Sequence, residues 1–157
     1  KIAVAGEESG PEKIMGIARH ELARYMQYAD AVLVEADGAK RMACKVPNDR
    51  EPVLLPQSDI VIGVMGLDVV GKTLREACFR LEQAMKLLQV PADHKITEED
   101  MVKILTNSNG TRKSVGLRDY YVVLNKCDDA MRLKSAEKIV MLLEKQGLRH
   151  AVATKLL

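Results

Sequence analysis

Short apolar runs alternate with longer stretches of helical periodicity along this chain. The apolar runs predict strands over residues 2–5, 31–34, 60–65, 120–124 and 151–153. Apolar residues recurring every three or four positions predict helices over residues 18–28, 74–88, 97–105 and 135–147, the last with Ser135 as N-cap and Gly147 as stop. Strands that alternate with helices are typical of βαβ units. The predicted fold is α/β, with one open, mainly parallel, doubly wound sheet.

The run over residues 31–34 is apolar at every position, which predicts a strand buried on both faces. It stops at Glu35, and prolines 47, 52 and 56 then predict a loop over residues 40–58, lying over the surface or over a site. In open α/β sheets, ligands bind beyond the carboxyl ends of the strands. Residues that directly follow predicted strands are therefore the first candidates for a functional site.

Composition restricts the class of protein and its partners. Hydrophobic residues make up 47% and charged residues 29% of the 157 positions, which predicts one compact α/β domain over residues 1–157. Because the chain starts at Lys1 in a strand-like run, we expect a C-terminal portion of a longer protein. The formal net charge is +2, no basic block stands out and aromatic residues are 3%, so nucleic acid and membrane surfaces are not indicated as partners.

The three cysteines, Cys44, Cys78 and Cys127, are isolated in sequence and form no CxxC pair. This pattern fits a reducing cytoplasm and predicts no disulfide. No stretch approaches the roughly 18 apolar residues that span a bilayer, so we expect a cytoplasmic protein. Cys44 is a candidate reactive thiol, with a structural cysteine as the alternative.

The segment after the second predicted strand carries a candidate metal and phosphate site. Asp37 follows the strand in the position where P-loop NTPases hold Mg²⁺ or its water, and Glu35 lies beside it as a second candidate catalytic carboxylate. Gly38 permits close approach of the backbone to a phosphate. An ordinary Asp-Gly turn is the alternative explanation.

A second candidate follows the strand predicted over residues 120–124. Asn125, Lys126 and Asp128 form the pattern NKxD, in which the carboxylate can accept from N1–H and the exocyclic amine of guanine while the lysine stem lies along the base. Thr154 and Lys155 follow the last strand at a position where a further base-contacting loop would lie. A polar turn at the end of a strand is the alternative.

The segment from Gly66 to Thr73 matches the P-loop pattern G-x₄-G-K-[ST], which makes Lys72 and Thr73 candidate phosphate contacts. The β-branched pair at residues 69–70 resists the backbone curl that a P-loop needs, and Asp68 would bring negative charge toward the phosphates. A strand-to-helix turn with an exposed Lys72 is the alternative.

Basic side chains in the proline-containing loop offer further contacts for an anion. Lys40 and Lys45, with Arg41 and Arg50 nearby, could bind phosphates or an anionic cofactor. Solvated surface charge is the alternative.

Together these segments resemble the YqeC-type family, described as selenium-dependent hydroxylase accessory or selenium cofactor biosynthesis proteins. The stretches that carry the resemblance are residues 32–40 (VLVEADGAK), 45–47 (KVP), 51–53 (EPV), 62–67 (IGVMGL), 71–72 (GK) and 124–128 (LNKCD). The resemblance runs from about Ala31 to the C-terminus and implies a P-loop NTPase-like fold. Family members begin with a glycine-rich P-loop, which we expect to be absent here because the chain begins at Lys1.

The resemblance implies a role in supplying or installing the selenium of selenium-dependent molybdenum hydroxylases, which would be the client proteins. With the site candidates, it predicts an accessory protein that binds and hydrolyses GTP or ATP with Mg²⁺ held through water by Asp37. The alternative is a non-catalytic scaffold or cofactor-binding module with an NTPase-like fold. A third hypothesis is a transferase in which Cys44 carries selenium.

Overall fold

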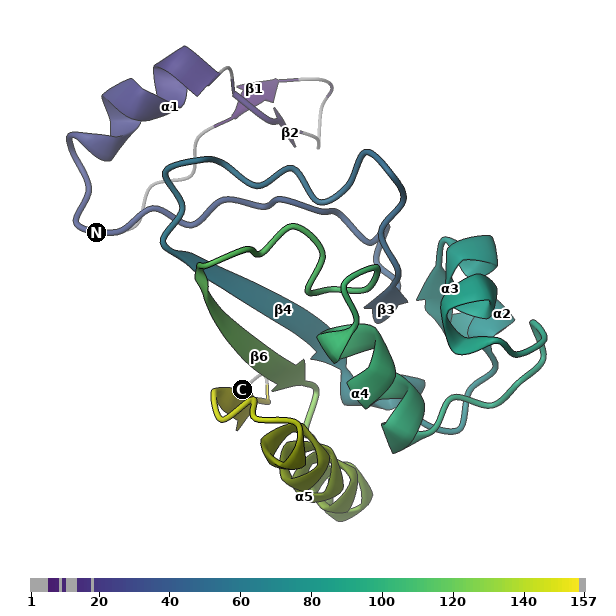
Figure 1. Ribbon diagram of the computed structural model, residues 1–157. Coiled ribbons are helices and arrows are strands. Elements are labelled where there is room, and N and C mark those ends of the chain that lie inside the picture. Colours follow the sequence, from purple (N-terminus) through teal and green to yellow (C-terminus); the bar gives the residue numbers. More distant parts are fainter. Residues whose placement is uncertain (1–5, 9, 11–13, 18, 156–157) are drawn as a thin grey trace. The chain divides into compact units, whose positions relative to one another are not determined.

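The computed structural model describes residues 6–8, 10, 14–17 and 19–155 (Figure 1). The chain divides into two compact units, Lys1–Glu35 and Ala36–Leu157. The strand predicted over residues 2–5 lies outside the described residues. A single domain over residues 1–157 stays a prediction.

In its described residues, the first unit contains two short paired strands and a helix. Strands β1 (Glu7–Glu8) and β2 (Ile14–Met15) pair antiparallel, and α1 (Arg19–Met26) confirms the helix predicted over residues 18–28. The strand predicted over residues 31–34 is wrong, since this segment has no regular structure and Leu33 is 90% exposed. An apolar run becomes a strand only where a neighbouring strand accepts its backbone hydrogen bonds. The sequence pattern could not show whether such a partner was present.

The second unit is built on a parallel sheet of β4 (Ile60–Gly66), β6 (Asp119–Asn125) and β7 (Ala151–Ala153), in that spatial order. The register of β4 and β6 runs from Ile60 opposite Asp119 to Gly66 opposite Asn125. These strands confirm the predictions over residues 60–65, 120–124 and 151–153. The α/β class and the parallel direction of the sheet are therefore confirmed for this unit.

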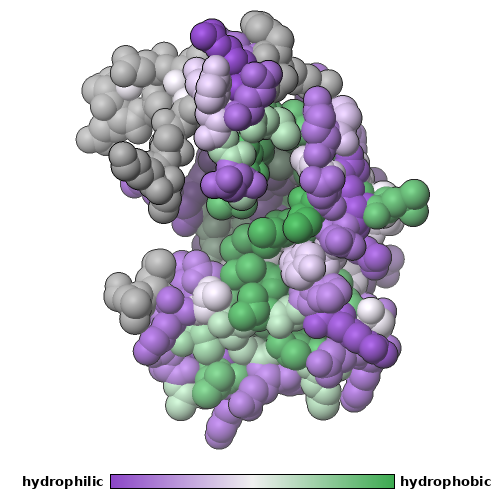
Figure 2. Space-filling model, turned by 90° about the vertical axis from the view of Figure 1, so that its left-hand side faces the viewer, coloured by the Kyte–Doolittle hydropathy of each residue, from purple (hydrophilic) through white to green (hydrophobic). Residues whose placement is uncertain are grey.

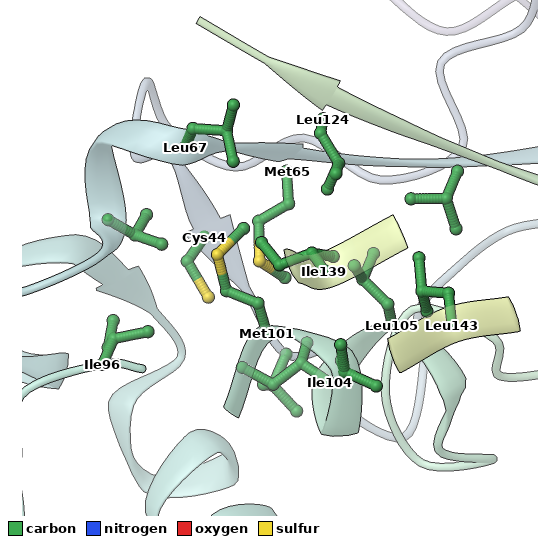
Figure 3. Close-up of a cluster of buried hydrophobic side chains, with 14 of the residues drawn as sticks. Cys44, Met65, Leu67, Ile96, Met101, Ile104, Leu105, Leu124, Ile139 and Leu143 are labelled. Carbon is green, nitrogen blue, oxygen red and sulfur yellow. The ribbon is translucent and has the colours of Figure 1, made fainter. Parts of the chain in front are cut away.

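One face of this sheet forms the hydrophobic core with helices α4 (Glu98–Thr106) and α5 (Ala130–Lys145). Figure 3 shows the core side chains pointing toward one another, among them Met65 of β4, Leu124 of β6, Met101 of α4 and Ile139 of α5. The opposite face of β4 is exposed: Ile60, Ile62 and Val64 have 52, 47 and 58% of their surface accessible. Figure 2 shows one side of the molecule, where hydrophobic residues lie at the surface beside hydrophilic ones. Within the second unit, α4 and α5 thus cover one face of the sheet, whereas a doubly wound sheet has helices on both faces.

The helix predicted over residues 74–88 is interrupted. The structure instead has α2 (Leu74–Ala77), β5 (Cys78–Phe79) and α3 (Leu81–Leu88), with Arg80 left-handed at φ 70° between the last two. Strand β5 pairs in parallel with β3 (Cys44–Lys45). The apolar spacing did identify buried positions, since Ala77, Ala84 and Leu88 are buried. Here β5 pairs with β3, more than thirty positions earlier, and this pairing outweighs the local preference for a helix. Local spacing cannot predict a pairing between such distant segments.

The helix ends follow capping chemistry. Thr97 caps α4 with a capping box completed by Asp100, which confirms the predicted start of that helix. Helix α5 begins earlier than predicted, because Asp129 is its N-cap. The predicted cap, Ser135, lies inside the helix, and its hydroxyl donates to Glu98. Gly147 follows the end of α5 at φ 82°, as expected for a stop residue. None of the described helices is both long and apolar enough to cross a membrane.

Candidate functional site

Two loops meet at the carboxyl edge of the parallel sheet. Asp68 lies in η1 (Leu67–Val69), directly after β4, and Lys126 directly follows β6. Asp68 Oδ2 accepts hydrogen bonds from Lys126 Nζ at 3.0 Å and from Lys72 Nζ at 3.2 Å. The structure thus brings the GLDVVGKT segment and the NKCD segment together. We call Asp68, Lys72, Asn125, Lys126 and Thr154 the carboxyl-edge cluster.

Asn125 orders the loop after β6 through its side-chain oxygen. Its Oδ1 accepts from the backbone N–H of Lys126 at 2.8 Å and from the hydroxyl of Thr154 at 3.1 Å. The backbone N–H of Cys127 donates to the carbonyl of Thr154 at 2.9 Å. Lys126 is left-handed at φ 61°, which turns its side chain toward η1. The ends of β6 and β7 therefore form one connected surface.

Asp68 is held as a carboxylate inside this cluster. Burial acts to raise its pKa, but hydrogen bonds from Lys126 and Lys72 outweigh burial and bring the pKa below its usual value. Its Oδ1 is buried and has no hydrogen-bond partner among the described residues. A Cβ at Gly66 would lie 2.5 Å from that oxygen, so glycine is required to make room for the carboxylate.

The backbone of the GLDVVGKT segment is already hydrogen-bonded within the protein. The N–H groups of Val70, Gly71 and Lys72 donate to the carbonyls of Leu67, Ile96 and Val69. Thr73 caps α2, and its hydroxyl and backbone N–H both donate to Glu76. In this conformation Lys72, whose side chain is 50% exposed, is the group of this segment best placed to reach an external phosphate.

Asp128 lies at the surface next to the carboxyl-edge cluster. Its carboxylate accepts from Arg132 Nη1 at 2.8 Å, one turn along α5, and 46% of the side chain is exposed. The neighbouring Asp129 has a different task, because it caps α5. Asp128 is therefore accessible, and only its Oδ2 is engaged by Arg132, so the carboxylate keeps capacity to accept hydrogen bonds from a ligand.

A second group of charges surrounds Phe79 on the β3–β5 pair. Lys45 Nζ forms an ion pair with Asp37 and lies 2.9 Å from Glu51 Oε1. Arg80 Nη2 lies 3.0 Å from the same oxygen of Glu51, and the Lys45 side chain is only 7% exposed. We call these five residues and Lys40 the Phe79 cluster.

Three cations of this cluster approach the Phe79 ring. The ammonium groups of Lys40 and Lys45 each lie 5.2 Å from the ring centroid, and the guanidinium carbon of Arg80 lies 4.7 Å from it. These distances are within the range of cation–π attraction. With two carboxylates against three cations, the cluster has a positive excess that favours an anionic ligand.

The two acids of the Phe79 cluster have opposite pKa shifts. Burial raises the pKa of Asp37, despite the hydrogen bond and charge of Lys45. For Glu51, burial also acts to raise the pKa, but hydrogen bonds from Arg80, Lys45 and the backbone of Asn48 lower it to about 2. Glu51 is the fixed counter-charge of the cluster, whereas Asp37 is the carboxylate that takes up a proton more readily.

The two clusters belong to the same unit and share a backbone contact. The carbonyl of Ala43, which directly precedes β3, accepts from the N–H of Gly66 at the end of β4 at 3.0 Å. A Cβ at Gly66 would also lie 3.0 Å from the Cβ of Ala43. The end of β4 therefore connects the carboxyl-edge cluster with the strand that carries Lys45.

The structure places the predicted site residues in different environments. Asp37, Gly38, Lys40 and Lys45 gather at the Phe79 cluster, with the carbonyl of Gly38 accepting from Lys45 Nζ at 2.9 Å. Lys72, Asn125 and Lys126 lie in the carboxyl-edge cluster, Asp128 is beside it, and Thr73 is a helix cap. Glu35 is exposed and ends the first unit.

Sequence reasoning missed Glu51, Phe79 and Arg80 as site residues and counted Asp68 only as an obstacle to phosphate. Glu51 had a signal, because it belongs to the EPV stretch that carried the family resemblance. Phe79 and Arg80 lie where a continuous helix was predicted, so the helical spacing gave no reason to assign them to a site. Among the described residues, no three His, Cys, Asp or Glu side chains are grouped so that they could hold a metal ion.

Comparisons with known proteins agree with the resemblance noted in the sequence. Residues 1–82, just over half of the chain, match the family described as "YqeC protein". This match includes every residue of the Phe79 cluster but not Asn125–Asp128. It also begins earlier than the resemblance, which was placed from about Ala31.

An Escherichia coli (strain K12) protein named "Uncharacterized protein YqeC" is 30% identical over 107 residues, which is 65% of this chain and 42% of that protein. The chain thus spans less than half the length of this curated relative. No solved structure matches the chain, so a P-loop NTPase-like fold stays a prediction. The family match establishes that the chain belongs to the YqeC protein family.

Proposed function

We propose that this chain binds a nucleotide at the carboxyl edge of its parallel sheet, as part of an accessory protein for the maturation of selenium-dependent molybdenum hydroxylases. The observation that carries the proposal is the shared Asp68 carboxylate, to which Lys72 and Lys126 both donate. It joins the segment that resembles a phosphate loop to the segment that resembles a guanine-reading loop. Ligands of open α/β sheets bind at this edge.

The phosphates would be bound by side chains rather than by a backbone cradle. Lys72 offers a half-exposed ammonium at the carboxyl-edge cluster, and Lys40 offers another at the Phe79 cluster. An ammonium contacts phosphate oxygens as a point charge and therefore needs no precise fork geometry. This arrangement supports binding of a triphosphate without the curled backbone of a P-loop.

Mg²⁺ fits this proposal only through water and phosphate oxygens. Asp37 is already paired with Lys45, so it would hold the ion through a water molecule, as Mg²⁺ often keeps several waters. When bound with a nucleotide, the ion would neutralise phosphate charge. The residues of the chain keep Asp37 oriented through Lys45, which also donates to the carbonyl of Gly38.

The base would be read by Asp128. A carboxylate accepts from N1–H and the exocyclic amine of guanine, whereas adenine offers neither donor in that arrangement. Asn125 keeps the loop in place through Thr154 and the Lys126 backbone. GTP is therefore the favoured nucleotide, with ATP as the alternative that the titration below distinguishes.

The accessory role rests on what the sequence resemblance implies, since the family match itself names no role. Binding and hydrolysis of the nucleotide would gate the transfer of selenium or a cofactor intermediate to the client hydroxylase. To test this role, the selenium content of the client hydroxylase is measured after purification from cells with and without this protein. Equal selenium content in both preparations would remove the accessory function from the account.

A non-catalytic binding module is the second candidate function. It is favoured by the backbone N–H groups of residues 70–73, which all donate within the protein. A site that binds without hydrolysis needs no rearrangement of this segment. Phosphate release from GTP in the presence of Mg²⁺ separates the two functions, because the module would bind GTP and release none.

Titration with fluorescent GTP and ATP in Mg²⁺ tests the nucleotide proposal. We expect micromolar GTP binding that Asp128→Asn reduces toward the ATP value. Asp129→Asn is the matched control, because it changes the adjacent carboxylate in the same way and asparagine still caps a helix. GTP and ATP binding of equal strength, unchanged by Asp128→Asn, would remove the guanine assignment.

The metal proposal has its own pair of variants. Asp37→Asn removes the charge that would orient Mg²⁺, and Asp49→Asn changes an exposed carboxylate of the same loop. We expect Asp37→Asn to abolish the gain in nucleotide affinity on adding Mg²⁺ and Asp49→Asn to retain it. A Mg²⁺ effect that survives in Asp37→Asn would place the ion elsewhere.

A further inference from the structure

Cys44 and Cys78 face each other across the short parallel ladder of β3 and β5. They are registered partners, and their sulfur atoms lie 3.2 Å apart. Registered residues of neighbouring strands have backbones about 4.8 Å apart, which is within the range that a disulfide can bridge. The function proposed above uses neither thiol.

The pair is enclosed by apolar side chains. Cys44 is 2% and Cys78 is 3% exposed, and Figure 3 shows Cys44 among Met65 and Met101. Both thiols are free in this structure. Cys78 Sγ also lies 3.6 Å from the carbonyl oxygen of Phe79, so the sulfur of Cys44, at 3.2 Å, is its nearer partner.

The two thiols are not equivalent. Cys44 donates its proton toward Cys78 Sγ, and this hydrogen bond lowers the pKa of Cys78. The same contact, together with burial, raises the pKa of Cys44. Cys78 is therefore the thiol that ionises first, and Cys44 is the proton-bearing partner beside it.

We propose that Cys44 and Cys78 form a dithiol that hydrogen peroxide oxidises to an intramolecular disulfide. In the first step the Cys78 thiolate attacks one peroxide oxygen, an S–O bond forms, the O–O bond breaks, and the departing hydroxide takes up a proton to leave as water. In the second step Cys44 sulfur attacks Cys78 sulfur, an S–S bond forms, and the S–O bond breaks. The hydroxyl leaves with the Cys44 proton as a second water, so two thiols lose two electrons and one peroxide is reduced.

Local opening of the ladder gives the oxidant its path. Strands β3 and β5 have two residues each, so few hydrogen bonds hold them together. Short elements of this kind open with a lower free energy than global unfolding. Hydrogen peroxide is close to water in size, so a small opening is sufficient.

The disulfide would lie directly beside the Phe79 cluster. Lys45 and Phe79 are the next registered pair of the same ladder, and Lys45 Nζ lies 5.2 Å from the Phe79 ring. A covalent bond between the preceding residues fixes the spacing of the two strands that carry these side chains. The oxidation state of the pair therefore bears on the geometry of the cluster.

Peroxide treatment of the folded protein in a Cys127→Ser background tests the proposal. After unfolding and alkylation, we expect both remaining thiols to be unavailable, one peptide pair joined through Cys44 and Cys78, and a mass lower by two hydrogens. Dithiothreitol should restore both thiols. Cys44→Ser should stop the cross-link and leave Cys78 as a sulfenic acid that a diketone probe traps, and Cys78→Ser should slow peroxide consumption.

Three results would overturn the proposal. The thiols could stay fully alkylatable after peroxide treatment, Cys78 could be overoxidised without any cross-link, or the cross-link could form only in urea. Circular dichroism of each variant before and after peroxide treatment checks that the protein stays folded, so that thiol oxidation is compared between folded proteins. A folded protein with two free thiols after excess peroxide contradicts the inference directly.

Discussion

The ammonium of Lys126 lies 3.0 Å from the carboxylate of Asp68, although 58 positions separate the two residues. Lys126 follows β6 and Asp68 follows β4, so this ion pair links the loops at the ends of two registered strands. Lys72 donates to the same oxygen. This one carboxylate therefore links the proposed base-reading loop to the proposed phosphate contact.

Removing the shared carboxylate should loosen both loops. We expect Asp68→Asn to lower the free energy of unfolding, and its double-mutant cycle with Lys126→Met to give a coupling energy of about 1 kcal/mol, kept modest because solvent screens the half-exposed lysine. Urea unfolding of the four proteins measures it. The exposed Asp93→Asn is the control, and a coupling energy near zero would contradict the linking role.

Acid should weaken the Phe79 cluster through Glu51. Its pKa is about 2 in the folded protein against 4.5 ordinarily, so its stabilising effect is complete above the ordinary value and is lost as the pH falls toward 2. Asp37 acts in the opposite direction, because its raised pKa means that protonation relieves the cost of a buried charge.

The measurement is urea unfolding of wild type and Glu51→Gln at about pH 5 and about pH 3, where we expect wild type to lose about 1 kcal/mol more than the variant. Glu82→Gln, at an exposed position of α3, should behave like wild type. Equal acid sensitivity of wild type and Glu51→Gln would show that Glu51 is not the responsible group.

The two faces of the sheet should respond differently to truncation. Leu124 is fully buried in the core, so Leu124→Ala should cost roughly 2–5 kcal/mol of unfolding free energy. Val64 projects from the open face and is 58% exposed, so Val64→Ala should cost under about 1 kcal/mol. Thermal and urea unfolding compare the two, and a large loss in Val64→Ala would mean that something covers this face in solution.

The start of α5 can be located by its cap. Asp129 accepts from the backbone N–H of Arg132, so Asp129→Ala should cost about 1 kcal/mol. Ser135→Ala loses a hydrogen bond to Glu98 but gains helix propensity, so its cost should be smaller. If Ser135→Ala were the more destabilising variant in urea unfolding, the helix would begin near Ser135, as its sequence alone predicts.

Periodic local patterns predicted the second unit well, because β4, β6 and α4 each satisfy their own apolar spacing and capping rules. The β3–β5 pair could not be predicted, because it depends on hydrogen bonds between residues such as Cys44 and Cys78 that are 34 positions apart. The same limit explains the wrong strand over residues 31–34, whose apolar composition says nothing about a pairing partner.

The site shows the same division between local and distant signals. Lys72 and Lys126 are recognisable from short motifs, and so is Asp37. Their partners are not, because the carboxylates of Asp68 and Glu51 receive their lysines from distant segments. A short motif therefore identifies a charged residue, but only the fold shows which residue of opposite charge it pairs with.

Backbone amide NMR of the labelled protein during GTP titration tests the nucleotide site most directly. We predict shifts concentrated in residues 37–40, 66–73, 125–128 and 154–155, weaker shifts with ATP, and loss of the pattern in Asp128→Asn. Shifts confined to other surfaces, such as the pocket lined by Arg112 and Arg149, or no shifts up to millimolar GTP, would contradict a nucleotide site at the carboxyl edge of the sheet.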